Sequence, residues 1–165
     1  MREVKARICF TKACLGDRKQ RADGTSKWPF YLLPRTGDGQ VRFEPRWWLA
    51  GLRFAAELLG RHQDSVEQVL ADARIYCDLS QVGFHQRYLN EHRYIRHECF
   101  PEGARIEIRL VVPTGLPDEG LRRLLEKMGQ FRGISPYGAK EYGFFVVEEV
   151  MPCEDQDCES GGQAP

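Results

Sequence analysis

One stretch of this 165-residue chain decides its fold: Gly133-Ile134-Ser135-Pro136-Tyr137-Gly138-Ala139-Lys140-Glu141-Tyr142-Gly143-Phe144-Phe145-Val146-Val147. Its three glycines stand five residues apart, at Gly133, Gly138 and Gly143. The stretch joins a helical pattern at 118–131 to a strand pattern at 143–150. Glycine is the usual residue where the backbone takes positive φ or lies close to another group. The stretch is therefore either a plain helix-to-strand turn or a loop shaped for close approach by a phosphate backbone, and glycines alone do not separate the two.

The segments around this loop show the periods of regular structure. At 118–131, apolar residues recur at helical spacing behind Asp118 and Glu119, two acids that suit the positive end of a helix. At 4–13 and 105–112, apolar residues alternate with charged ones, which predicts strands with one buried and one solvated face. The solvated face of these two strands carries four bases: Lys5, Arg7, Arg105 and Arg109.

Residues 44–60 predict the first helix of the chain. Pro45 suits its first turn, its apolar residues recur at helical spacing, and Gly60 ends it. Gly51 interrupts the middle of this helix at a cost of about 1 kcal/mol relative to alanine, which indicates close packing or the approach of a ligand. A shorter helix is predicted at 64–73.

A long insertion, 12–43, separates the first strand from the first helix. Within it, two short apolar runs at 30–33 and 40–43 flank the turn sequence at 36–39 and predict a β-hairpin. Bases and aromatic residues are interleaved there, which suits either a bound nucleic-acid strand or a solvated loop anchored by its rings. These residues are Arg18, Lys19, Arg21, Lys27, Trp28, Phe30 and Tyr31.

The elements follow the order strand, helix, strand, strand, helix, strand. This order predicts an α+β fold with a ferredoxin-like βαββαβ antiparallel sheet, two helices on one face and an insertion after the first strand. Segment 83–100 has strand character, and Gly103 suits a hairpin connection from it to 105–112. One domain then covers 1–152, and 153–165 forms an acidic flexible tail. The open, basic face of such a sheet is typical of a nucleic-acid platform.

The chain resembles the RAMP superfamily of CRISPR-associated RNA-binding proteins, and among them the backbone subunits of type III effector complexes. The likeness rests on the glycine-rich loop between the last helix and the last strand, and on the opening of the first helix. The corresponding residues of that helix are Pro45, Leu49, Gly51, Leu52, Arg53, Ala56 and Glu57. The chain departs from the family where Arg46, Trp47 and Trp48 replace small residues, so the tryptophans either block the RNA or offer it stacking.

The resemblance implies an RNA-binding subunit of a CRISPR-type, phage or mobile-element ribonucleoprotein. The RNA backbone would follow the glycine loop, the start of the first helix and the open face of the sheet. The implied contact residues are Arg46, Arg53, Gly133, Gly138, Lys140, Gly143, Arg105 and Arg109. The implied partners are single-stranded RNA and copies of the chain itself or other effector-complex subunits.

Two further functions stay open. A RAMP-like endoribonuclease would need a general base near the 2′-hydroxyl and a cation near the phosphate. Its catalytic residues are unknown; Asp23 and His62 are candidates, and only a version built on Asp23 would use Mg²⁺ as a cofactor. Alternatively, the chain is a protein-interaction or assembly module without nucleic acid, which its neutral charge favours.

Composition limits the remaining classes. The chain has 24 basic and 24 acidic residues, so no bulk charge draws it to nucleic acid, although its last twelve residues hold four acids and no base. The six cysteines include a C-x4-C pair near each end of the sequence, and this spacing does not match the closer pairs of zinc ribbons, so we predict free thiols and no metal. No apolar run could span a bilayer and no apolar signal region opens the sequence, so we expect a cytoplasmic protein without membrane contact.

Overall fold

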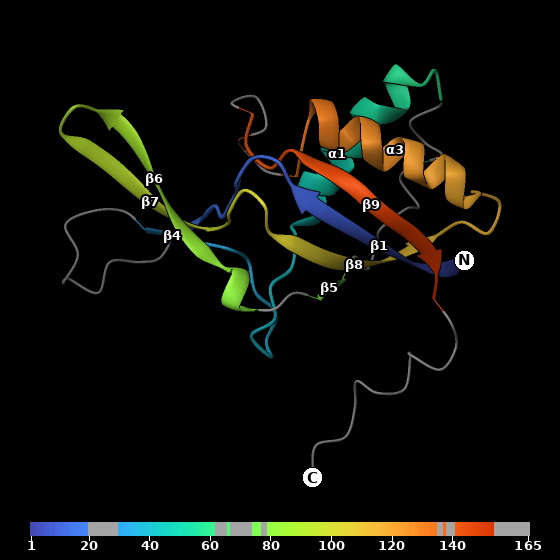
Figure 1. The fold of residues 1–165 in the computed structure, drawn as a ribbon, viewed down its shortest axis with the longest axis horizontal. Helices are drawn as coiled ribbons and strands as arrows, with labels where there is room; N and C mark the ends of the chain where they lie inside the picture. The colour runs from blue at the N-terminus through green and yellow to red at the C-terminus, as the bar shows by residue number, and fades with distance from the viewer. Residues whose placement is uncertain are drawn as a thin grey trace, which may run out of the picture.

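The computed structural model describes residues 1–19, 30–61, 66, 74–76, 79–134, 137 and 141–153. These residues form two β-sheets, with two long helices beside the four-stranded one (Figure 1). The fold is thus a mixture of helices with antiparallel and mixed sheets, compatible with the predicted α+β class.

The main sheet has the strand order β5-β8-β1-β9, and each neighbouring pair is antiparallel. Its strands are β5 (Arg74–Tyr76), β8 (Arg105–Val112), β1 (Arg2–Phe10) and β9 (Phe145–Pro152). β1 is an inner strand of this sheet, between β8 and β9, and Val4, Ala6 and Ile8 on one of its faces are fully buried. The same alternation in β8 completes the apolar face of the sheet.

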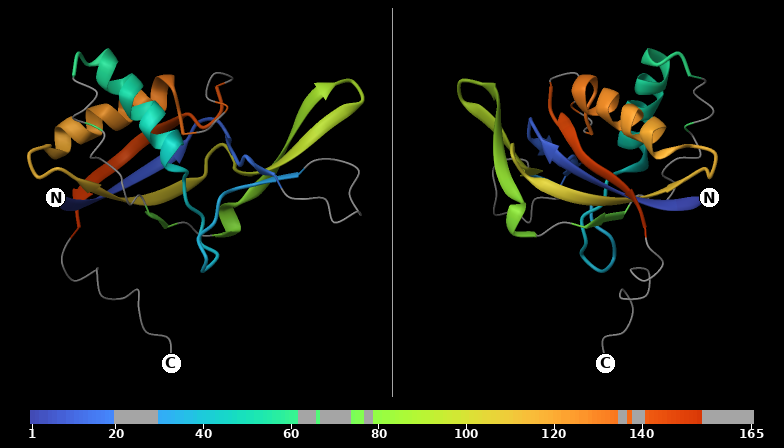
Figure 2. Two further views of the ribbon diagram at one scale, coloured as in Figure 1. Left: turned by 180° about the vertical axis from the view of Figure 1, so that it is seen from behind. Right: turned by 45° about the vertical axis from the view of Figure 1, so that its right-hand side comes forward.

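Two helices, α1 (Pro45–Leu58) and α3 (Asp118–Phe131), cover that apolar face (Figure 2). Two glycines allow them to pack closely. A Cβ on Gly51 would lie 2.8 Å from Cγ of Met128 on α3, and a Cβ on Gly129 would lie 2.3 Å from the carbonyl oxygen of Phe145 on β9. The glycine inside the first helix therefore serves helix packing in this fold.

A second sheet is built around β7 (Arg93–Phe100), which pairs with three other strands. These are β6 (Gly83–Asn90), β2 (Cys14–Leu15) and β4 (Phe30–Leu32), and β4 also pairs with β3 (Arg18–Lys19). A short 3-10 helix, η1 (Leu79–Gln81), precedes β6. The β6–β7 hairpin, called the arm below, projects from the body of the molecule away from the N-terminus (Figure 1).

Two predictions about strand pairing are wrong. Gly103 does make the turn between β7 and β8, with φ of +88°, but β8 pairs with β5 instead of β7. The edges of β7 are already occupied by β6 on one side and by β2 and β4 on the other. Likewise, β4 pairs with β7 instead of with 40–43, and a single bridge from Arg35 to Val41 closes the turn at 36–39.

The other predicted elements differ mainly at their ends. The first strand ends at Phe10 instead of residue 13, and the predicted helix at 64–73 lies outside the described residues except for Val66, which is helical and buried. Within the described part of the chain, no helix has the length and apolar character needed to cross a bilayer.

Candidate nucleic-acid interface

The glycine loop closes on itself through its two outer glycines. Gly133 and Gly143 both have positive φ, +71° and +76°. The Ile134 N–H donates to the Gly143 carbonyl at 2.9 Å, and the Gly143 N–H donates to the Ala13 carbonyl at 2.8 Å. A Cβ on Gly133 would lie 2.7 Å from the carbonyl carbon of Gly143. These glycines therefore fasten the loop to the end of β1, while Gly138 and Lys140 lie outside the described residues.

A fully buried histidine, His97 on β7, connects the arm to this region. Its Nδ1 lies 2.8 Å from the Gly16 carbonyl oxygen, to which it donates, and its Nε2 lies 3.4 Å from Nε of Arg87, from which it accepts. Tyr31 stacks on the imidazole at a centroid distance of 5.1 Å, and Tyr137 meets it edge-on at 5.3 Å. Burial lowers the pKa of His97, and the neutral ring is the form that satisfies both bonds.

This buried histidine makes stability depend on pH. Because the folded pKa of His97 is below the usual value of 6.5, the unfolded chain binds more protons between these two values, and stability is lost as pH falls below about 6.5. The expected slope is at most about 1.4 kcal/mol per pH unit. Chemical denaturation between about pH 7 and pH 5 should show this loss of stability, and His97→Gln should reduce the slope to the part that His85, whose pKa is also lowered, contributes. An equal slope in the variant would contradict this origin.

A second histidine, His85 on β6, contacts the far end of the glycine loop. Its Nε2 lies 3.3 Å from the Tyr142 hydroxyl, and the two rings meet edge-on at a centroid distance of 5.4 Å. Burial, followed by the nearby charge of Arg87, lowers the pKa of His85. The arm and the loop are therefore joined through neutral side chains that can both donate and accept hydrogen bonds.

The start of α1 presents Arg46 to the segment that follows β2. Nη2 of Arg46 lies 2.5 Å from Oδ2 of Asp17, and the arginine side chain is 70% exposed while the aspartate side chain is 14% exposed. Burial raises the pKa of Asp17, and the charge of Arg46 opposes this effect. Arg53 lies further along α1 on an exposed position. The predicted cations of α1 are thus at the surface, with Arg46 oriented by a carboxylate.

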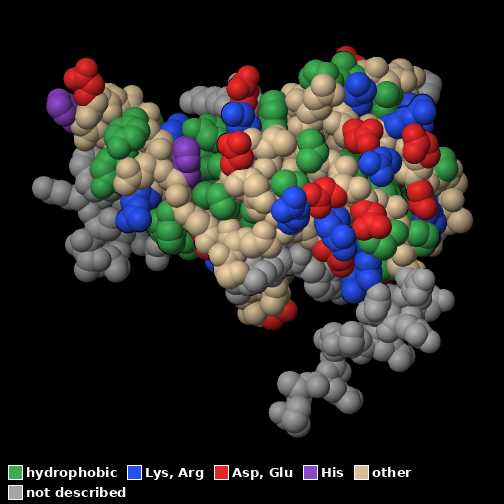
Figure 3. Space-filling view, in the orientation of Figure 1, with side chains coloured by type: hydrophobic (Ala, Val, Ile, Leu, Met, Phe, Trp, Pro, Cys, Tyr) green, Lys and Arg blue, Asp and Glu red, His purple; other side chains and the backbone are tan. Residues whose placement is uncertain are grey.

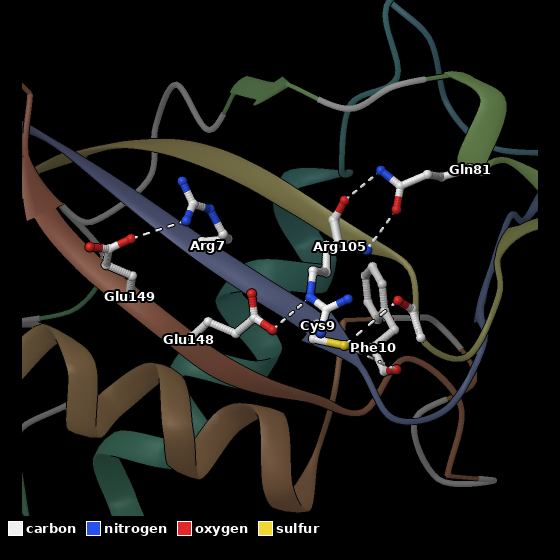
Figure 4. A network of polar contacts seen from close by, with 8 residues as sticks. Arg7, Cys9, Phe10, Gln81, Arg105, Glu148 and Glu149 are labelled. Carbon is white, nitrogen blue, oxygen red and sulfur yellow. Dashed lines mark hydrogen bonds and ion pairs between the residues drawn. The ribbon is translucent and has the colours of Figure 1, made fainter.

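The open face of the main sheet is charge-balanced. Arg105 pairs with Glu148 of β9 at 2.8 Å, and Arg7 pairs with Glu149 at 3.2 Å. Figure 4 shows both pairs on this face. Gln81 fixes the backbone of Arg105 by donating to its carbonyl at 2.7 Å and accepting from its N–H at 2.8 Å. Acids and bases are correspondingly interspersed over the right-hand part of the space-filling view (Figure 3). Arg109, half-buried on β8, shares this face.

The catalytic candidates cannot be placed, because Asp23 and His62 both lie outside the described residues. Among the residues that the structure does describe, no three His, Cys, Asp or Glu side chains gather as a metal site would require. Cys14 is a buried thiol whose pKa is raised, chiefly by burial, and it donates to the Ile134 carbonyl. In its protonated thiol form, Cys14 therefore holds the start of the glycine loop through this hydrogen bond.

The residues at the junction of the two sheets were not predicted from the sequence. His85, Arg87, Ile95 and His97 share one face of the arm, because His85 pairs with His97 and Arg87 with Ile95. The period-two alternation of 83–100 could have indicated this face. Only the register of the hairpin, however, shows that His85 and His97 lie opposite each other.

Comparison with known proteins gives a fold and no family. No protein-family model and no curated protein matches the sequence. Among solved structures, a chain in the cryo-EM structure of type III-B Cmr-beta bound to cognate target RNA matches with a TM-score of 0.61 and 11% identity, over 92% of this chain and 61% of that chain. A chain of a type IV-B CRISPR complex matches with a TM-score of 0.54 and 10% identity, over 99% and 94%.

These two neighbours belong to CRISPR complexes, and at such low identity the likeness shows a shared fold. This chain spans 61% of the length of the type III-B chain.

Proposed function

We propose that this protein is an RNA-binding subunit of a CRISPR-type ribonucleoprotein, or of a related phage or mobile-element complex. The observation that carries the proposal is the fold match over 92% of the chain to a component of an RNA-bound type III-B assembly. The strand order β5-β8-β1-β9, with α1 after β1 and α3 after β8, supports a ferredoxin-like, RAMP-like domain.

The RNA backbone would cross the junction between the two sheets. Arg53 on α1 and Lys140 in the glycine loop would supply cations, and Arg46 would contribute less because Asp17 compensates its charge. Arg87 on the arm supplies another, and its guanidinium lies 5.0 Å from the centre of the Tyr137 ring. The open sheet face contributes less, because Glu148 compensates Arg105. Binding would therefore be concentrated at the junction and would depend on phosphate neutralisation.

The partners would include copies of this chain or other subunits of the complex. Three large apolar side chains of the arm are mostly exposed: Phe84 (61%), Tyr88 (66%) and Leu89 (55%). Figure 3 shows apolar side chains gathered on this projecting part of the surface. Exposed apolar patches on a projecting element are typical of interaction sites.

Single-stranded RNA binding should weaken strongly as salt rises. With about three phosphate contacts, raising salt from about 50 mM to about 200 mM should reduce affinity about twentyfold, and losing one contact should lower the log–log slope by about 0.7. Lys140→Glu should weaken binding and lower the slope. Lys127→Glu on α3, the matched control with the same charge change, should do neither. Fluorescence anisotropy with labelled RNA measures both quantities.

The same assay tests the alternative functions. No binding by the wild type at about 50 mM salt would overturn the RNA-binding proposal and favour an assembly module. Cleavage of the RNA, followed with and without Mg²⁺, would instead identify an endoribonuclease. Asp23→Asn and His62→Ala would then show which candidate is catalytic, since loss of cleavage without loss of binding is the mark of a catalytic residue.

A further inference from the structure

A pocket of about 400 Å³ lies where the base of the arm meets the end of β1 and the end of the glycine loop. Its lining includes Lys12, His85, Pro101, Glu102, Glu141 and Tyr142. A volume of this size suits a ligand such as a nucleotide. The backbone contacts proposed above use none of these residues, so the pocket is an additional feature of the same junction.

Three charged side chains of the pocket have no partner among the described residues. The side chains of Lys12, Glu102 and Glu141 form no hydrogen bond or ion pair within the described ranges of the chain, whereas Arg7 and Arg105 on the main sheet face are paired. The pocket therefore offers carboxylate acceptors and an ammonium donor that are available to a ligand.

The backbone of Glu141 is in a strained conformation. Its φ is +65°, the one positive value at a non-glycine residue in the described chain. Left-handed backbone at a residue with a side chain is uncommon and is concentrated at binding and active sites. Here it lies directly before Tyr142, whose contact with His85 forms a wall of the pocket.

The walls and the charges together favour a nucleotide. Tyr142 and His85 provide ring surface, and every nucleobase has a face that stacks on such rings. Lys12 can neutralise a phosphate. Among the bases, guanine presents N1–H and N2–H side by side, so it can donate two parallel hydrogen bonds to the two oxygens of one carboxylate. The other bases lack this paired donor edge.

We infer that this pocket binds a single unstacked guanine of the RNA. The carboxylate of Glu141 or Glu102 accepts hydrogen bonds from N1–H and N2–H of the base. Tyr142 stacks on the base, and Lys12 lies beside a phosphate. The inference rests on the proposed function and deepens it. Contacts with the RNA backbone are independent of base sequence, so a guanine pocket would add selectivity for one base to the proposed binding.

Anisotropy with short labelled oligouridines that carry guanine, adenine, cytosine or uracil at the centre tests this inference. The guanine oligonucleotide should bind about fivefold to about hundredfold more tightly than the others, the discrimination typical of a bidentate base contact. The double variant Glu102→Gln/Glu141→Gln should lose this preference and keep its affinity for oligouridine. Glu126→Gln, an exposed acid on α3, is the matched control and should keep the preference.

The outcomes separate the inference from the proposed function. Equal binding of all four oligonucleotides, or a guanine preference that survives in the double variant, would overturn the guanine pocket and leave RNA binding intact. Binding of none of them would overturn RNA binding. In that case, titration with guanosine and uridine monophosphates, followed by the NMR signals of the His85 ring, decides the pocket separately: a shift with guanosine alone supports it, and no shift or equal shifts overturn it.

Discussion

Gly129→Ala is expected to lower the free energy of unfolding by about 3 kcal/mol, in the upper range for overpacking a well-packed contact. A Cβ at this position would lie 2.3 Å from the carbonyl oxygen of Phe145 and 2.8 Å from its ring. The carbonyl belongs to β9, so relief requires α3 to move away from the sheet. The gain in helix propensity, about 1 kcal/mol, does not compensate for that movement.

The control for this prediction is Gly115→Ala. No heavy atom lies within 4 Å of a Cβ built there, so its effect should stay within about 0.5 kcal/mol. Urea denaturation of the two variants beside the wild type gives both values. An unchanged midpoint for Gly129→Ala would show that α3 and β9 do not pack as closely as described.

Glu98→Ala is expected to cost about 3 kcal/mol, because it removes the acceptor of a buried hydrogen bond together with the buried member of a partly buried ion pair. The Glu98 side chain is 7% exposed. One carboxylate oxygen accepts from the Leu33 N–H at 2.8 Å, and the other pairs with Arg35. The substitution would leave that N–H buried without a partner and would release the end of β4 from β7.

Glu149→Ala on the open face is the matched comparison. Glu149 pairs with Arg7 at 3.2 Å, and both side chains are nearly half exposed, so the loss should be below about 1 kcal/mol. Equal losses in the two variants would contradict the importance of burial. A loss of RNA binding in folded Glu98→Ala, measured at low temperature, would further show that the insertion must be held against β7 for the interface to form.

The regular elements of the main sheet and its helices could be read from periodicity. β1 and β8 alternate strictly, and α3 has an apolar stripe with acids at its start, because each of these segments has one face in the core. The arm was harder to predict. Its charged and aromatic residues lie on a projecting hairpin with a largely exposed face, so the core imposes no simple pattern on most of it.

The candidate site was predictable only in part. Arg46 and Arg53 lie at the surface of α1, as an RNA contact requires, but the sequence could not show that Asp17 would orient Arg46. Arg105 was expected to contact RNA on the open face, whereas β9 places Glu148 beside it. Alternation along a strand predicts which of its residues share a face. Which charged residues of the neighbouring strand lie beside them depends on the pairing register.

By itself, the sequence determined the mixed class of the fold, the two helices, and the importance of the glycine stretch at 133–147. Tertiary structure decided what those glycines do. Gly133 lies against the Gly143 carbonyl, where a side chain would not fit, and Gly143 donates a hydrogen bond to the segment that follows β1. Tertiary structure also decided that 83–100 leaves the main sheet to form the arm. Local periodicity is set by neighbouring residues, whereas pairing and pocket formation depend on segments distant in the chain, such as Lys12, His85 and Tyr142.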